Sequence, residues 1–300
     1  MRQSLVDLFK NTIVLKYHLK NDSLGIDKCI YTNVQNDFCF ENINDDKLVE
    51  VIYNSIVDYA FNEKEFDEED INDLHFEAID QRVRIEDDDS DETKEKYGIF
   101  GETLLNLFLV NYFGTNAIIA KGYFYDILKP EENKGYDSFH LVETQNYTNL
   151  WFGEVKFYQD YIGALDNIFK NIEKAISDDY FIKNLKALTP KKNDIDTESV
   201  TIKEIIRRLR KKPDINIVDL VKDFNLKLIY PICVICQIKT DYDNTIRKII
   251  DYIKTNLSGK NLTIGINYEL FLILLPINNV KQVKQEVVKW INSKAQLTLL

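Results

Sequence analysis

One stretch of this sequence limits the fold more than any other: a nearly unbroken apolar run from Leu226 to Ile238. Strands that face water on one side alternate between apolar and polar residues, whereas strands buried on both faces are apolar throughout. The run therefore predicts a central, buried strand. Such a strand needs helices packed on its sheet, and other segments of the chain have the helical periodicity to provide them.

The elements expected from Thr93 onward follow the order α, β, β, β, α, β, α, β, α, which is typical of an α/β protein with helices packed on a sheet. The helices are expected over 93–112, 160–182, 244–257 and 280–291, and the strands over 116–125, 136–142, 150–158, 226–238 and 262–275. Upstream, apolar spacing predicts a helix over 45–61 and strands over 12–17 and 28–32. The prediction is an N-terminal α/β lobe, residues 1–92, and a domain of residues 93–300 that ends in an αβα extension.

Residues 63–95 form an acidic belt that includes the run from Glu86 to Glu92. Blocks of like charge are usually solvated, so a loop between helices is the plainer interpretation. The alternative is an autoinhibitory or partner-binding segment, because a row of carboxylates resembles a phosphate backbone and can block a DNA site. The sequence leaves the role of this belt open.

The formal net charge of −11 argues against a simple nucleic-acid-binding protein, because affinity for DNA depends largely on neutralising phosphates. A nucleic-acid function would need a local basic surface or a partner that brings the DNA. Basic residues do gather over 183–212, and the candidate nucleic-acid-binding residues there are Arg207, Arg208, Arg210, Lys211 and Lys212. Acidic residues in the same segment, such as Glu204, leave an ordinary solvated helix as the alternative.

Several features indicate a soluble cytoplasmic protein with no membrane association. No N-terminal signal pattern is visible, and the apolar runs are too short to span a membrane. Four cysteines in 300 residues suggest reduced thiols. Cys233 and Cys236 have the spacing of metal ligands, but alternation along a strand would place them on opposite faces, so buried structural thiols are expected. The sequence has no glycine-rich phosphate-binding loop, so the chain is not expected to be an ATPase.

The residues that point to chemistry lie on the two strands over 136–142 and 150–158. If these strands form an antiparallel hairpin that turns near Gln145 and Asn146, Asp137 lies opposite Glu154 and both point to one face. Lys156, two residues further along, points to the same face. The sequence therefore predicts a polar trio on strands that are otherwise aromatic and apolar.

Two facing carboxylates raise each other's pKa unless a cation lies between them. Oxygen ligands of this kind suit Mg²⁺ or Mn²⁺ better than Zn²⁺. Phosphodiester hydrolysis needs such a metal, a water and a cation for the developing negative charge, and Lys156 would be that cation. Glu102, on the preceding helix, could reach the same edge as a further ligand or a water-positioning group. For His140 a structural role is favoured over direct catalysis.

Three segments carry a resemblance to a known family. They are FGETLL (100–105), GYDSFH (135–140) and WFGEVKFY (151–158). Together they resemble the PD-(D/E)xK nuclease superfamily, and within it the HamA family, the nuclease subunit of the Hachiman anti-phage defence system. The resemblance extends over about residues 93–240 and is weak at the flanks. One departure from the superfamily pattern is that no proline precedes Asp137.

The resemblance implies a restriction-endonuclease-like core, an α-β-β-β-α-β mixed sheet flanked by helices. It implies Asp137 and Glu154 as metal ligands, Lys156 as the catalytic lysine and Glu102 as a further member of the site. It also implies a helicase partner, which would load DNA and so account for the acidic charge.

The leading hypothesis is a Mg²⁺-dependent nuclease acting on DNA. The alternative is a catalytically silent nuclease fold that acts as a DNA sensor or as a regulatory subunit of a partner enzyme. RNA as the substrate is not excluded, because such a metal site reads the phosphate and not the sugar.

Overall fold

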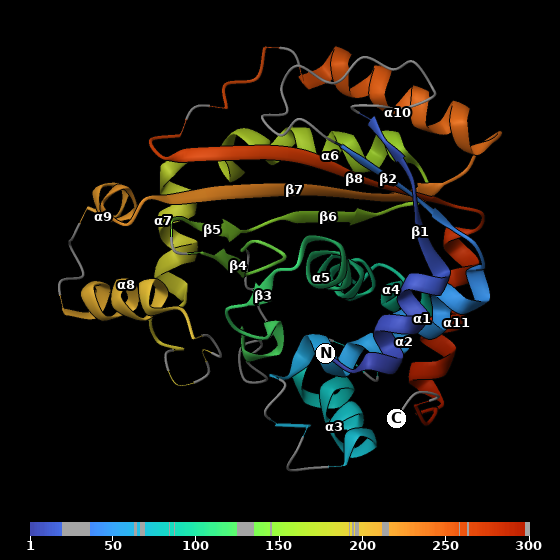
Figure 1. Cartoon of the computed structure of the whole chain (residues 1–300). Coiled ribbons are helices and arrows are strands. Elements are labelled where there is room, and N and C mark those ends of the chain that lie inside the picture. Colours follow the sequence, from blue (N-terminus) through green and yellow to red (C-terminus); the bar gives the residue numbers. More distant parts are fainter. Residues whose placement is uncertain are drawn as a thin grey trace.

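A curled, mixed β-sheet lies between two layers of helices in the computed structural model (Figure 1). The structure describes residues 1–19, 37–62, 65–66, 70–83, 85–86, 88–124, 135–144, 146–191, 193, 195, 198–211, 216–257, 259–262 and 264–297. The predicted strand over 28–32 lies outside these residues. The predicted α/β class with a mixed, helix-flanked sheet is confirmed.

Eight strands form the sheet in the order β1-β2-β8-β7-β5-β4-β3, with β6 also pairing with β7. Their bounds are β1 (Ile13–His18), β2 (Phe38–Asn42), β3 (Asn116–Ala117), β4 (His140–Glu143), β5 (Thr148–Trp151), β6 (Glu154–Phe157), β7 (Leu226–Gln237) and β8 (Asn267–Ile277). The pairs β5–β7, β6–β7, β7–β8 and β2–β8 are parallel, and the pairs β1–β2, β3–β4 and β4–β5 are antiparallel.

The apolar run that predicts a central strand is β7, which has strands on both sides. Its side chains alternate between two separate cores. Ile232 and Cys236 belong to the core that contains α6 and α10, whereas Cys233 and Ile235 belong to the core that contains α2 and α5. Cys233 and Cys236 are therefore buried thiols on opposite faces of the sheet, as predicted.

The helices divide between the same two cores. On one side lie α6 (Tyr161–Ala175), α7 (Asp178–Ala187), α8 (Val200–Lys211), α9 (Ile217–Asp223) and α10 (Tyr242–Leu257). On the other side lie α1 (Gln3–Thr12), α2 (Asp45–Ala60), α5 (Ile99–Phe113) and α11 (Val280–Asn292). In Figure 1, α6 and α10 run above the sheet, and α5, α2 and α11 run below it.

The N-terminal residues take part in the same sheet and the same helical layer. Strand β2 pairs in parallel with β8, and α2 packs against α5 and α11. Asn44 caps α2 by accepting hydrogen bonds from the backbone N–H groups of Asp46 and Lys47. The cap satisfies amide groups that would otherwise have no partner at the start of the helix.

The strand expected over 150–158 is broken into β5 and β6 at Phe152 and Gly153. Both pieces pair with β7 in one continuous register, which places the break opposite Pro231. Proline has no backbone N–H to donate, so it cannot complete a sheet ladder. A Cβ on Gly153 would lie 2.6 Å from the ring of Pro231 and 2.8 Å from its carbonyl oxygen, so only glycine fits there.

Other boundaries also differ from those expected. The strand over 116–125 is only two residues long and is followed by a short 3-10 helix, η4 (Lys121–Phe124). The helix over 160–182 ends at Ala175, and Ser177 caps a second helix, α7. The acidic belt is partly helical, with α3 (Ile71–Glu77), a π-helical turn over Ala78–Arg82, and α4 (Asp91–Lys94).

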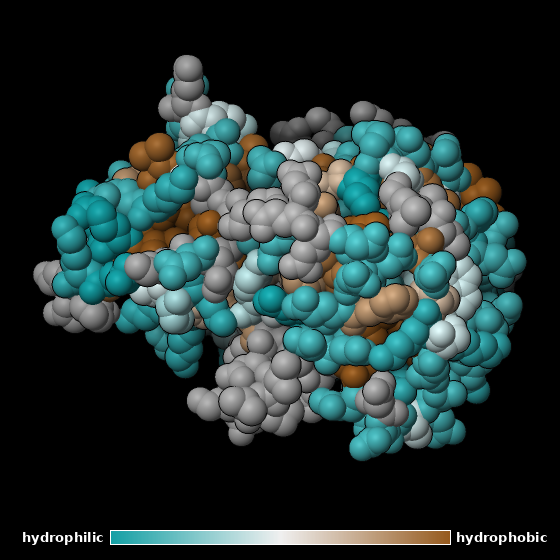
Figure 2. All heavy atoms as spheres, turned by 90° about the horizontal axis from the view of Figure 1, so that it is seen from below, coloured by the Kyte–Doolittle hydropathy of each residue, from teal (hydrophilic) through white to brown (hydrophobic). Residues whose placement is uncertain are grey.

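The molecular surface seen from below is mainly hydrophilic, with small hydrophobic areas between the polar side chains (Figure 2). None of the described helices is both long and apolar enough to cross a membrane.

Candidate active site

Asp137 lies beside the start of β6, next to Glu154. Strand β4 begins only at His140, so the predicted ladder does not extend as far as Asp137. Instead, the backbone N–H of Asp137 donates to the carbonyl oxygen of Gly153 at 2.9 Å. Oδ2 of Asp137 accepts a hydrogen bond of 2.8 Å from the backbone N–H of Val155. The structure thus places Asp137 and Glu154 close together, through a loop rather than through a regular hairpin.

Glu154 and Lys156 point to the same side of β6 and form an ion pair. Their side chains are 23% and 19% exposed. Val155 and Phe157, which alternate with them, are buried in the core that contains α5. The alternation therefore turns Glu154 and Lys156 away from that core, as the strand pattern predicts.

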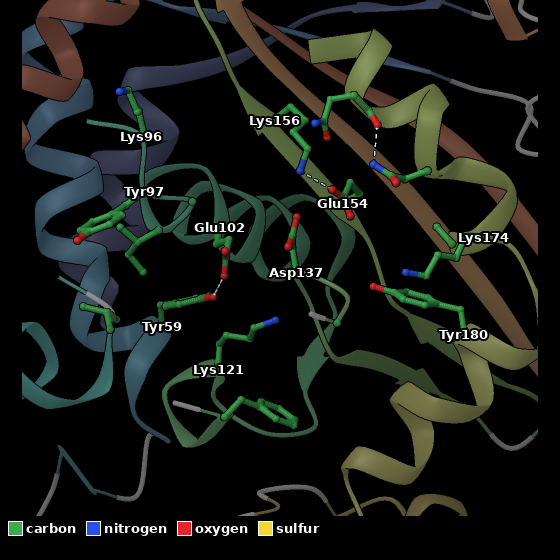
Figure 3. Close-up of a pocket in the computed structure, with 18 of the residues that line it drawn as sticks. Tyr59, Lys96, Tyr97, Glu102, Lys121, Asp137, Glu154, Lys156, Lys174 and Tyr180 are labelled. Carbon is green, nitrogen blue, oxygen red and sulfur yellow. Dashed lines mark hydrogen bonds and ion pairs between the residues drawn. The ribbon is translucent and has the colours of Figure 1, made fainter. Parts of the chain in front are cut away.

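Glu102 reaches the same place from the first turn of α5. Its carboxylate accepts a hydrogen bond from the hydroxyl of Tyr59 on α2 (Figure 3). Burial raises the pKa of Glu102, and the charge of Asp137 raises it further. Burial and the charge of Glu102 likewise hold the pKa of Tyr59 well above its ordinary value, so Tyr59 is a hydrogen-bond donor near neutral pH.

The four predicted site residues line one cavity of about 460 Å³. In Figure 3 they come from two directions, with Glu102 on the side of α5 and with Glu154 and Lys156 on β6, while Asp137 lies between them. Besides three carboxylates, the described lining contains five cationic side chains: Arg82, Lys96, Lys121, Lys156 and Lys174. The described part of the lining therefore has more cationic than anionic side chains, in a chain whose formal charge is −11.

The electrostatics of the site follow from burial and from the crowding of charges. Burial raises the pKa of Glu154 to about 7, the charge of Asp137 adds to this rise, and Lys156 opposes it. Burial alone would lower the pKa of Lys156, but the charges of Glu154 and Asp137 outweigh it, so the pKa lies above its ordinary value. Lys156 is thus a permanent cation near neutral pH.

The donor chemistry of the site fits a hard divalent cation. Asp137, Glu154 and Glu102 offer only carboxylate oxygens, which Mg²⁺ and Mn²⁺ prefer. In this structure Glu154 is turned to Lys156 and Glu102 to Tyr59. Accordingly, no group of three or more His, Cys, Asp or Glu side chains among the described residues is arranged to hold a metal ion. Binding of the metal by all three carboxylates would require these two side chains to exchange partners.

His140 and the basic segment lie outside the described lining of this cavity. His140 is 4% exposed, and its Nδ1 is 2.8 Å from the hydroxyl oxygen of Thr115. Burial lowers the pKa of His140 to about 3, so the ring is neutral near pH 7, in line with a structural role.

The basic residues of 200–211 lie on α8. Arg207 and Arg208 both form ion pairs with Glu204, whereas Arg210 and Lys211 are exposed. Lys212 lies outside the described residues. The expected nucleic-acid contact of this segment stays a prediction.

Several cavity residues were not predicted from the sequence. Tyr59, Lys121, Lys174 and Tyr180 come from α2, η4, α6 and α7. No motif marks these residues, because each is an isolated polar residue in an ordinary amphipathic segment.

The fold and the cavity define an α/β protein with a mixed, curled sheet flanked by helices, which is compatible with a nuclease-like core. Within that class the chain belongs to the HamA family, whose family model matches residues 7–291. This membership confirms the predicted family and suggests an anti-phage defence protein. No curated protein matches the sequence, and no solved structure matches it either.

Proposed function

We propose that this chain is a Mg²⁺- or Mn²⁺-dependent nuclease that hydrolyses phosphodiester bonds of DNA. The observation that carries the proposal is the meeting of Asp137, Glu154 and Lys156 in one cavity, with Glu102 beside them. Acidic oxygen ligands and a neighbouring cation are the parts that phosphodiester hydrolysis requires. Membership of the HamA family supports the same activity.

The protein side chains have separate roles in this proposal. Asp137, Glu154 and Glu102 would hold the metal, which supplies an activated water and neutralises negative charge on the phosphate. Lys156, kept protonated by its carboxylate neighbours, would donate hydrogen bonds to the negative charge that develops on the phosphate oxygens. Tyr59 would orient Glu102 through their hydrogen bond.

We further propose that the protein is the effector subunit of an anti-phage defence complex and that it works with a helicase or another ATPase subunit. The chain has a net charge of −11, so its long-range field repels DNA. A partner that carries the DNA to the cavity would remove this barrier. The five cations of the cavity would then act at short range.

A second candidate is a catalytically silent nuclease fold that senses DNA or regulates a partner enzyme. The observation in its favour is that Glu154 and Glu102 are engaged by Lys156 and Tyr59 rather than gathered as a metal cluster. Calorimetric titration with Mg²⁺ separates the two candidates, because a silent scaffold would bind no Mg²⁺.

The decisive test is cleavage of plasmid and linear DNA in Mg²⁺, with and without a candidate helicase partner. Glu154→Ala and Lys156→Ala should each lower the rate of cutting by about 100-fold or more, because each group acts directly on the transition state. The matched control is the Lys227–Glu269 ion pair on β7 and β8, which lies outside the described lining of the cavity. Full cutting by Glu154→Ala would disprove the proposal.

A further inference from the structure

The size of the cavity limits what can enter it. Its volume is about 460 Å³, within the range of pockets for small molecules and far below what a duplex occupies. The acidic groups and Lys156 are only partly exposed at its wall. A flexible single strand can bring a phosphodiester to these groups with its sugar and base inside the cavity, whereas a duplex can present only its backbone there.

Two lysines stand on either side of the carboxylates. In Figure 3 the Lys121 side chain rises from η4 toward Asp137, and the Lys174 side chain extends from α6 into the cavity. The Nζ of Lys121 donates to the backbone carbonyl of Tyr136. No ion pair joins either lysine to a carboxylate among the described residues. Both ammonium groups can therefore meet phosphates that flank the reacting one.

Aromatic rings lie beside these cations. Tyr180 packs edge-on against Tyr136, with 5.0 Å between ring centroids, and its hydroxyl points into the cavity (Figure 3). The Nζ of Lys174 lies 5.4 Å from the centroid of the Tyr180 ring. Tyr97 stands on the opposite wall. Aromatic rings beside cations are the usual means by which proteins hold a single strand, through base stacking and phosphate contacts.

We infer that this cavity takes a single, unpaired DNA strand, with Lys121 and Lys174 on its phosphates and Tyr180 against a base. The inference rests on the proposed nuclease function and specifies its substrate. It also fits a helicase partner, because strand separation produces the single strand that the cavity can accept. Opening of a duplex would let a phosphodiester enter together with its own base and so reach Asp137, Glu154 and the Tyr180 ring at once.

The experiment is binding of a fluorescent single-stranded oligonucleotide and of the matching hairpin duplex by the full-length protein, measured by anisotropy in EDTA over a range of salt. The wild type should bind the single strand at least about tenfold more tightly than the duplex. Lys174→Ala should weaken single-strand binding and make the slope of log K against log salt shallower by about 0.7, the value for one lost phosphate contact.

Matched variants separate this role from a structural one. Lys281→Ala removes an exposed lysine of α11 that lines none of the described cavities and lies outside the basic segment 183–212, so its salt slope should equal that of the wild type. Tyr180→Leu should weaken single-strand binding about fivefold or more, whereas Tyr180→Phe keeps the ring and should bind as the wild type. Tyr147→Leu, at a tyrosine 44% exposed on the β4–β5 turn, is the aromatic control.

The inference is overturned if the duplex binds as tightly as the single strand, if neither binds, or if Lys174→Ala has the salt slope of Lys281→Ala. Failure of the proposed function looks different. Single-strand binding with no cleavage in Mg²⁺ would refute the nuclease and leave the strand-binding inference standing. Cleavage of a closed duplex at the same rate as a single strand would support the nuclease and overturn the inference.

Discussion

Replacing Glu154 by glutamine should change how the stability of the protein depends on pH and on Mg²⁺. The pKa of Glu154 is about 7 in the folded protein, because of burial and then of Asp137, against an ordinary value of 4.5. The folded state therefore holds this proton more tightly than the unfolded chain. The stability that the protonated group contributes is present below about pH 4.5 and is lost as the pH rises through 7.

The magnitude follows from these two pKa values. Between about pH 5.5 and about pH 8, the wild type should lose about 2 kcal/mol more unfolding free energy than Glu154→Gln, which has no proton to release. Urea unfolding in EDTA at both pH values measures the difference. Glu269→Gln is the control, because it alters a Lys–Glu pair on the same sheet outside the described lining of the cavity.

Mg²⁺ should reverse this loss in the wild type. A divalent cation between the carboxylates favours their ionised forms, so Mg²⁺ at pH 8 should raise the unfolding free energy of the wild type but hardly that of Glu154→Gln. If the wild type and Glu154→Gln give parallel curves of unfolding free energy against pH in EDTA, burial and Asp137 do not raise the pKa of Glu154. If Mg²⁺ stabilises both equally, the metal binds elsewhere.

Three further predictions concern the fold and its surface. Gly153→Ala should lower the unfolding free energy by about 1–3 kcal/mol in urea, because its methyl group overlaps the facing strand, whereas Gly163→Ala in α6, where the nearest atom lies at 3.8 Å, should raise it. The buried ring of His140 has a pKa of about 3, so the wild type should lose unfolding free energy as the pH falls from 7.5 to about 5, where the unfolded chain binds a proton and the folded protein does not. His140→Gln should lose about 2 kcal/mol less over the same range. Replacing both Arg210 and Lys211 by alanine should weaken DNA binding and reduce its salt slope if α8 contacts phosphates, and unchanged binding would assign α8 to the solvent.

The negative net charge argues against a nucleic-acid-binding protein, but the structure has a local group of cationic side chains at the cavity. The chain is acidic overall, yet five cationic side chains of the described residues converge on the cavity from separate segments. Arg82 lies within the acidic belt, Lys121 belongs to η4, and Lys174 belongs to α6. The net charge of the chain does not reveal this local group of cations, because the interaction between charges depends on their distance in space and not on their positions in the chain.

The sequence alone was enough for the features that depend on local pattern. The apolar run of β7 predicts a central strand, and its alternation predicts the burial of Cys233 and Cys236 on opposite faces. Two-residue periodicity puts Glu154 and Lys156 on one side of β6. Periodicity also predicts most of the order of helices and strands from Thr93 onward, because each element must hide its own apolar face. It does not predict α8 and α9, which precede β7.

The break between β5 and β6 required the tertiary structure. Gly153 and Pro231 are distant in sequence, and each looks ordinary where it stands. Only the register of β7 places the proline opposite the glycine, where the ladder lacks an N–H and where a side chain has no room. The loop that carries Asp137 then fills this gap, with its N–H on the carbonyl of Gly153.

The central strand, the class of fold and the four polar residues of the candidate site could be predicted from the sequence, because they lie in short segments whose periodicity or motif is local. The contacts around these four residues could not: the hydrogen bond of Tyr59 to Glu102, the position of Lys121 and Lys174 at the cavity, and the excess of cations over carboxylates in its described lining. The physical reason is that burial, hydrogen bonding and electrostatic coupling depend on distances between segments, and those distances are set by the packing of α2, α5 and α6 around the sheet.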